Sequence, residues 1–74
     1  IGEYFIQNNT GVLYEYLADG GVRFWIPENV QSGGWVLGPR LDTRLEPGGS
    51  IEFSSSGALR GHFGGVRVLA ALER

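Results

Sequence analysis

Glycine doublets at regular spacing are the feature that most limits what this chain can fold into. Thirteen of the 74 residues are Gly, and doublets stand at positions 20–21, 33–34, 48–49 and 64–65. Because glycine adopts positive φ without steric cost, such doublets are typical of tight turns. The segments between them are short and rich in aromatic and β-branched residues, which favour strands. The spacing therefore predicts an all-β fold.

The segments between the turns carry the apolar patterns of strands. We expect strands at residues 2–8, 12–17, 22–26, 35–37, 41–45, 50–54 and 62–72. Asp19-Gly20 is typical of a β-hairpin turn, and residues 54–61 are expected to form a Ser/Gly loop. The last segment is apolar at nearly every position, so we expect a strand buried on both faces, with a helical turn at its end as the alternative. The predicted fold is a small antiparallel β-sandwich or barrel of five to seven short strands, in a single domain over residues 1–74.

Alternation within these strands predicts the core, because every second side chain points to the same face. The expected core residues are Phe24, Ile26, Ile51, Phe53, Val66 and Val68. All four phenylalanines are expected to fill this small core, which adds Phe5 and Phe63.

The small size of the chain favours self-association. A domain of this length buries only about 60% of the surface of its unfolded chain, which leaves little stability in reserve. The chain has no Cys, so no disulfide or thiolate metal site can compensate. We therefore expect a homo-oligomer built through edge strands or the C-terminal segment, with Leu69 or Leu72 against a neighbouring subunit.

Charge and residue content exclude several functions. Six Arg and eight acidic residues give a formal net charge of -2, which argues against a nucleic-acid binder that neutralises phosphates. There is no Lys for a P-loop, and the single His, His62, is not a metal site. No apolar run approaches the roughly 20 residues of a membrane-spanning segment. The chain contains no Met, and both a mature secreted protein and an excised domain fit that observation.

No catalytic constellation is recognisable. A triad could be drawn from Ser54, Ser55 or Ser56 with His62 and Asp42, but no nucleophile elbow accompanies them. The paired carboxylates of a glycosidase need a cleft, for which so small a domain has little room. We therefore expect a protein that is not an enzyme and that needs no cofactor and no metal.

Surface aromatics are the remaining functional signal. Trp25 alternates with the apolar face of its strand and stands close to Arg23, which suits stacking on a sugar ring, a lipid headgroup or another protein. Trp35 follows a glycine doublet and either anchors the loop or presents its ring at the surface. The expected ligand-binding residues are Trp25, Trp35 and Tyr14 for stacking and Arg23, Arg40 and Asp19 for hydrogen bonds.

Three stretches resemble the aegerolysins, a family of β-sandwich lipid-binding proteins. FIQNNTG (residues 5–11) is similar to their first strand and turn, LEPGGSIEFSSSG (45–57) to a strand entering a Ser/Gly loop, and GHFGGVRVL (61–69) to the strand that follows. The family is nearly twice as long, and the cysteine usual in that loop is Ser here. GGWVLGPR (33–40) departs from the family and resembles a motif of small cyanobacterial-type mannan lectins. Both resemblances imply surface recognition rather than catalysis.

Two functions therefore stay open. The first is a non-enzymatic β-sheet binding module that recognises a glycan or a membrane-lipid headgroup through surface aromatics and Arg. The second is a structural or assembly protein that self-associates through edge strands. Exposure of Trp25 and Trp35 would favour the first, whereas burial of both would leave a packed scaffold.

Overall fold

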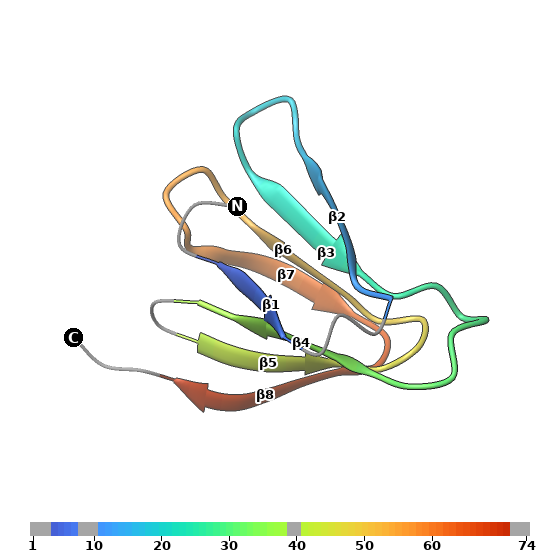
Figure 1. The fold of residues 1–74 in the computed structure, drawn as a ribbon. Coiled ribbons are helices and arrows are strands. Elements are labelled where there is room, and N and C mark those ends of the chain that lie inside the picture. The colour runs from blue at the N-terminus through green and yellow to red at the C-terminus, as the bar shows by residue number, and fades with distance from the viewer. Residues whose placement is uncertain (1–3, 8–10, 39–40, 72–74) are drawn as a thin grey trace.

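A computed structural model describes residues 4–7, 11–38 and 41–71. Over these residues the chain forms eight strands and no helix, which confirms the all-β class (Figure 1). The strands are β1 (Phe5–Gln7), β2 (Leu13–Tyr16), β3 (Val22–Trp25), β4 (Gly34–Leu37), β5 (Leu41–Leu45), β6 (Ser50–Phe53), β7 (Leu59–Phe63) and β8 (Val66–Ala71).

The strands form two four-stranded antiparallel sheets, so the architecture is a sandwich. Sheet A has the order β1-β4-β5-β8, and sheet B has the order β2-β3-β6-β7. The chain passes between the sheets two strands at a time, because the β2–β3 and β6–β7 hairpins belong to sheet B and the β4–β5 hairpin belongs to sheet A (Figure 1). This order leaves β2 and β7 as the edge strands of sheet B, and β1 and β8 as those of sheet A.

The core lies between the central strands of the two sheets. Its buried apolar side chains are Val12, Val22, Phe24, Ile26, Val36, Leu45, Ile51 and Phe53. Four of the six residues expected there are thus confirmed, and Val66 packs against the cluster while partly buried. The prediction for Val68 is wrong, because its side chain is 44% exposed. Val68 lies opposite the buried Thr43, but on the edge strand β8, where the inner face is not fully covered.

The C-terminal segment, expected as one strand, is two. Ser54 and Ala58 close the β6–β7 turn with a backbone hydrogen bond of 2.9 Å, so β7 begins at Leu59, inside the expected loop. Gly64, with φ +66°, then turns the chain from sheet B to sheet A. The strand count is therefore one above the expected five to seven. The contacts expected at Leu69 and Leu72, like the expected burial of Phe5, concern side chains outside the described part.

Two glycine doublets allow this crossing. A Cβ added at Gly49 would lie 2.5 Å from the carbonyl oxygen of Gly65, and one added at Gly64 would lie 2.6 Å from that of Gly48. Next to this contact, the backbone N–H of Glu46 donates a hydrogen bond to the Gly65 carbonyl over 2.6 Å. The doublets therefore serve close packing of two backbone segments as well as turns.

Candidate functional site

The register of sheet B assembles an outward-facing row of mainly apolar side chains. Residues directly opposite one another in antiparallel strands point to the same face. Leu13, Trp25, Ser50 and Phe63 lie opposite one another across β2, β3, β6 and β7. They point away from the core, because Phe24 beside Trp25 is buried. Phe63 is 78% exposed and Leu13 45% exposed, whereas Trp25 and Ser50 between them are partly buried. We call these four residues the apolar row.

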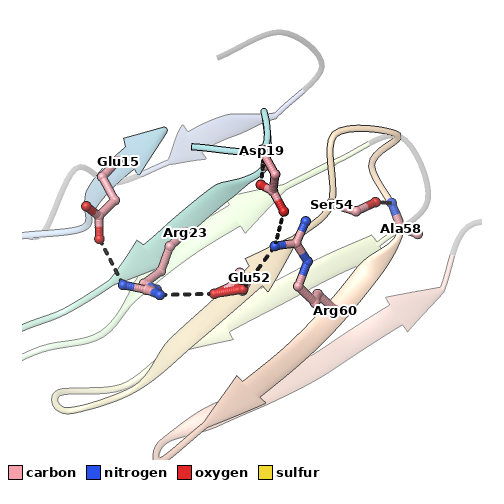
Figure 2. A network of polar contacts seen from close by, with 8 residues as sticks. Glu15, Asp19, Arg23, Glu52, Ser54, Ala58 and Arg60 are labelled. Atoms are coloured by element: carbon pink, nitrogen blue, oxygen red, sulfur yellow. Dashed lines mark hydrogen bonds and ion pairs between the residues drawn. The ribbon is translucent and has the colours of Figure 1, made fainter. Parts of the chain in front are cut away.

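A chain of ion pairs crosses sheet B (Figure 2). It lies on the same face as the apolar row, because Glu15, Arg23 and Glu52 are opposite one another two residues along their strands from Leu13, Trp25 and Ser50. Arg23 donates hydrogen bonds from Nη1 to Glu15 Oε1 over 2.9 Å and from Nη2 to Glu52 Oε2 over 3.1 Å. Arg60 Nη1 lies 2.8 Å from Asp19 Oδ2 and 3.5 Å from Glu52 Oε1. We call these five residues the charge ladder. With three carboxylates and two guanidinium groups, its formal charge is -1.

The β2–β3 turn holds one end of the ladder in place. Asp19 Oδ1 accepts a hydrogen bond of 3.0 Å from the backbone N–H of Gly21, and Gly20 has φ +91°, which confirms the predicted hairpin turn. The hydrogen bond from Gly21, together with the one from Arg60, lowers the pKa of Asp19 below its ordinary value of 3.8. The Asp19 carboxylate therefore stays ionised to a lower pH than an aspartate without these hydrogen bonds.

A hollow of about 430 Å³ lies between the apolar row and the ladder. It is lined by Arg23, Ser50, Glu52, Arg60, Gly61, His62 and Phe63. Gly61 lies opposite Glu52 and contributes no side chain, so this part of the sheet surface is bare backbone. The volume falls at the lower end of the roughly 300–1,000 Å³ that small-molecule sites occupy.

The structure brings three of the six predicted binding residues to this face. Trp25 belongs to the apolar row, and Arg23 and Asp19 belong to the ladder. Tyr14 does not join them, because it lies opposite the buried Phe24 and therefore belongs to the inner face of sheet B. Its ring centroid is 6.3 Å from that of Phe24, and the residue is 46% exposed at the edge of the sheet.

Trp35 lies on the other sheet. It is next to the buried Val36 on β4, so it points to the outer face of sheet A. The Arg44 guanidinium stands over its ring, 5.5 Å from the centroid, and Arg44 Nε donates a hydrogen bond of 2.9 Å to Glu46. One face of the indole is thus already occupied by a cation. Arg40, the sixth predicted residue, lies outside the described residues.

Sequence reasoning missed the most exposed aromatic residue on this face. The prediction that Phe63 lies in the core is wrong. The strand β7 carries a bulge in which Arg60 is an extra residue without a partner on β6. After the bulge, His62 lies opposite Ile51 and Phe63 lies opposite Ser50. Phe63 therefore points outward. The alternation of β6, which places Ser50 on the outer face, was the signal that could have found it once the pairing of β6 with β7 was known.

No family model, no curated protein and no solved structure matches this chain. The resemblances to the aegerolysins and the mannan lectins therefore remain expectations. Within the described ranges, no helix is long and apolar enough to cross a membrane. The same residues contain no group of three or more His, Cys, Asp or Glu side chains placed to hold a metal ion.

Proposed function

We propose that this chain is a non-enzymatic binding module that recognises an uncharged glycan through the outer face of sheet B. The observation that carries the proposal is the exposed ring of Phe63 in one row with Trp25, beside a hollow bordered by the ladder. A sugar ring has an apolar face that suits an aromatic ring and a rim of hydroxyls that suits polar groups. Small-ligand sites combine these two kinds of surface.

The spacing of the two rings suits a chain of sugar units. Trp25 on β3 and Phe63 on β7 are separated by one strand, β6. Neighbouring strands lie about 4.8 Å apart, so the two side chains start about 10 Å from each other. Ser50 lies between them and is small. An oligosaccharide running across the strands would therefore meet two aromatic surfaces without an obstacle between them.

The charges favour a glycan over a lipid headgroup. The ladder has a formal charge of -1 and the whole chain -2, so an anionic membrane surface would not attract this face. Ser50 also interrupts the apolar row, whereas insertion into a membrane requires a continuous apolar face. Uncharged hydroxyls can hydrogen-bond to both signs of charge in the ladder.

The first test is binding to a panel of neutral oligosaccharides with a matched pair of variants. Phe63→Ala removes the exposed ring, and we expect it to weaken binding about tenfold, which corresponds to about 1.4 kcal/mol. Tyr16→Ala is the control, because Tyr16 is 66% exposed but belongs to the inner face of sheet B. Equal losses in both variants would contradict the proposal. Binding to phosphatidylcholine vesicles with none to glycans would contradict it as well.

Self-association through edge strands is the second candidate function. Exposed apolar side chains on edge strands favour it, because such edges are templates for pairing with another chain. They include Tyr16 on β2 at 66% exposure, Leu59 on β7 at 47% and Val68 on β8 at 44%. We expect sedimentation velocity at high micromolar concentration to show an oligomer that the charged substitution Tyr16→Glu dissociates. A monomer at that concentration would remove this candidate.

A further inference from the structure

Gly61 is a glycine for which the fold provides no reason. Among the ten glycines whose surroundings are described, five have positive φ, which side chains rarely adopt: Gly11, Gly20, Gly48, Gly57 and Gly64. A Cβ would come within 2.8 Å of a neighbouring atom at four more: Gly21, Gly33, Gly49 and Gly65. A Cβ on Gly61 would meet nothing within 4 Å, and its φ is not positive.

Gly61 directly follows the bulge in β7, but it does not supply the positive φ for which some bulges need glycine. The extra residue of the bulge is Arg60, whereas Gly61 lies directly opposite Glu52. Glycine weakens a strand, because it adds backbone freedom to the unfolded chain and provides no side chain to pack. Glycine inside a strand often marks a bulge, a sharp bend, or a place where a ligand or another backbone segment approaches closely. Gly61 lies in the lining of the hollow, which is where such an approach is open.

We infer that Gly61 forms the floor of a subsite for one uncharged sugar unit, with Phe63 as its aromatic wall. This inference rests on the proposed function and adds the place and the chemistry of the bound unit. The ring would lie over the bare backbone of Gly61, where a larger side chain would exclude it. Its hydroxyls would point toward Glu52 and Arg60, which also line the hollow.

The charged side chains of Arg23, Glu52 and Arg60, which line the hollow, are joined in ion pairs, so a charged ligand would meet both signs of charge. Glu52 Oε1 and Arg60 Nη1 are 3.5 Å apart, so an anion near Arg60 would also meet the carboxylate, and a cation near Glu52 would also meet the guanidinium. A hydroxyl avoids both conflicts, since it donates to the carboxylate and accepts from the guanidinium. Hydrogen bonds to charged groups are stronger than those between neutral groups. The subsite therefore suits a neutral sugar.

A longer glycan would extend from this subsite over Ser50 to Trp25. The side chains of Phe63 and Trp25 leave the backbone about 10 Å apart, which leaves room for more than one sugar unit between the ends of the site. We therefore expect a tetrasaccharide to bind more tightly than the corresponding monosaccharide. Equal affinities would limit the site to the hollow itself and would overturn this extended arrangement.

The test is to fill the floor of the hollow with a side chain. Gly61→Val should be accommodated, because nothing lies within 4 Å of the added Cβ and β-branched residues favour strands. The probes are neutral tetrasaccharides of β-1,4-linked glucose, β-1,4-linked N-acetylglucosamine and α-linked mannose, measured by titration calorimetry. We expect Gly61→Val to weaken binding at least tenfold while its thermal unfolding temperature stays at or above that of the wild type. Gly61→Ala should cause a smaller loss of glycan affinity. If the Val variant does not fold, the same measurement is made on Gly61→Ala instead.

The control is Leu59→Val, which also places Val on β7, but opposite Phe53 on the inner face. Loss of binding in Gly61→Val with retention in Leu59→Val would support the subsite. Unchanged binding in Gly61→Val, combined with loss in Phe63→Ala, would overturn the subsite and leave the glycan-binding function standing. Absence of binding to all neutral probes by the wild-type chain would overturn both.

Discussion

Thr43 occupies a position in the core where a hydroxyl should be unfavourable. It is 0% exposed on β5, and its Oγ1 makes no hydrogen bond to any residue that the structure describes. Across sheet A it lies between Val36 on β4 and Val68 on β8. Replacing Thr43 with Val keeps the branched shape and exchanges the hydroxyl for a methyl group, which matches its neighbours. We therefore expect Thr43→Val to stabilise the fold.

The size of the effect follows from the cost of burying an unpaired polar group. That cost is about 1–3 kcal/mol, so the free energy of unfolding should rise by about 1–2 kcal/mol. For a domain of this size, each 1 kcal/mol corresponds to about 4–8 °C in Tm. The gain is large, because a chain of 74 residues has a total stability of only about 4–11 kcal/mol.

Urea unfolding followed by tryptophan fluorescence measures this change. Thr43→Ser is the matched control, because it keeps the hydroxyl and removes the methyl group, and it should lower stability. A Thr43→Val variant that is less stable than the wild type would refute the reasoning. It would mean that Oγ1 has a hydrogen-bond partner in solution whose loss outweighs the better packing.

Two further predictions concern the core and the β2–β3 turn. Phe53→Ala should lower the free energy of unfolding by about 3–5 kcal/mol, because the Phe53 ring is buried. Its centroid lies 4.6 Å from that of Tyr4 and 6.2 Å from that of Phe24. Thermal unfolding of the variant near the wild-type temperature would contradict the core assignment. The pKa of Asp19 is lowered from 3.8 in the folded protein, so the ionised carboxylate stabilises the fold. This stabilisation is complete at pH values above the ordinary pKa, and it is lost as the pH falls through the lowered pKa. In urea unfolding at a series of pH values, Asp19→Asn should thus be less stable than the wild type above about pH 4 and approach it in more acidic solution; a stability difference that does not change with pH would contradict this cause.

Local patterns were sufficient to predict the part of the site on β3. The alternation of Val22, Phe24 and Ile26 placed Trp25 and Arg23 on the outer face, because side-chain direction in a strand depends only on neighbouring residues. The turn at residues 19–20 was predictable for the same reason, since a two-residue hairpin signal is local.

The rest of the site depends on which strands are neighbours, and alternation does not contain that information. The apolar row and the charge ladder exist only because β2, β3, β6 and β7 lie side by side. Alternation also assigns a side chain to a face without telling whether anything covers that face. Tyr14 and Val68 both belong to inner faces, yet both are exposed, because their strands are edges. Phe63 was misplaced because its assignment to the core rested on residue type alone, whereas its face depends on the pairing of β7 with β6 and on the bulge at Arg60, which no local pattern reveals.

Chemical-shift mapping by NMR tests most directly whether the outer face of sheet B binds a glycan. The ¹⁵N-labelled protein is titrated with the neutral tetrasaccharides. We expect the indole N–H of Trp25 and the backbone amides of Ser50, Gly61 and Phe63 to shift together on one binding curve, while the indole N–H of Trp35 stays in place. Shifts confined to Trp35 or to the inner face of β2, or no shifts at saturating glycan, would contradict the proposal.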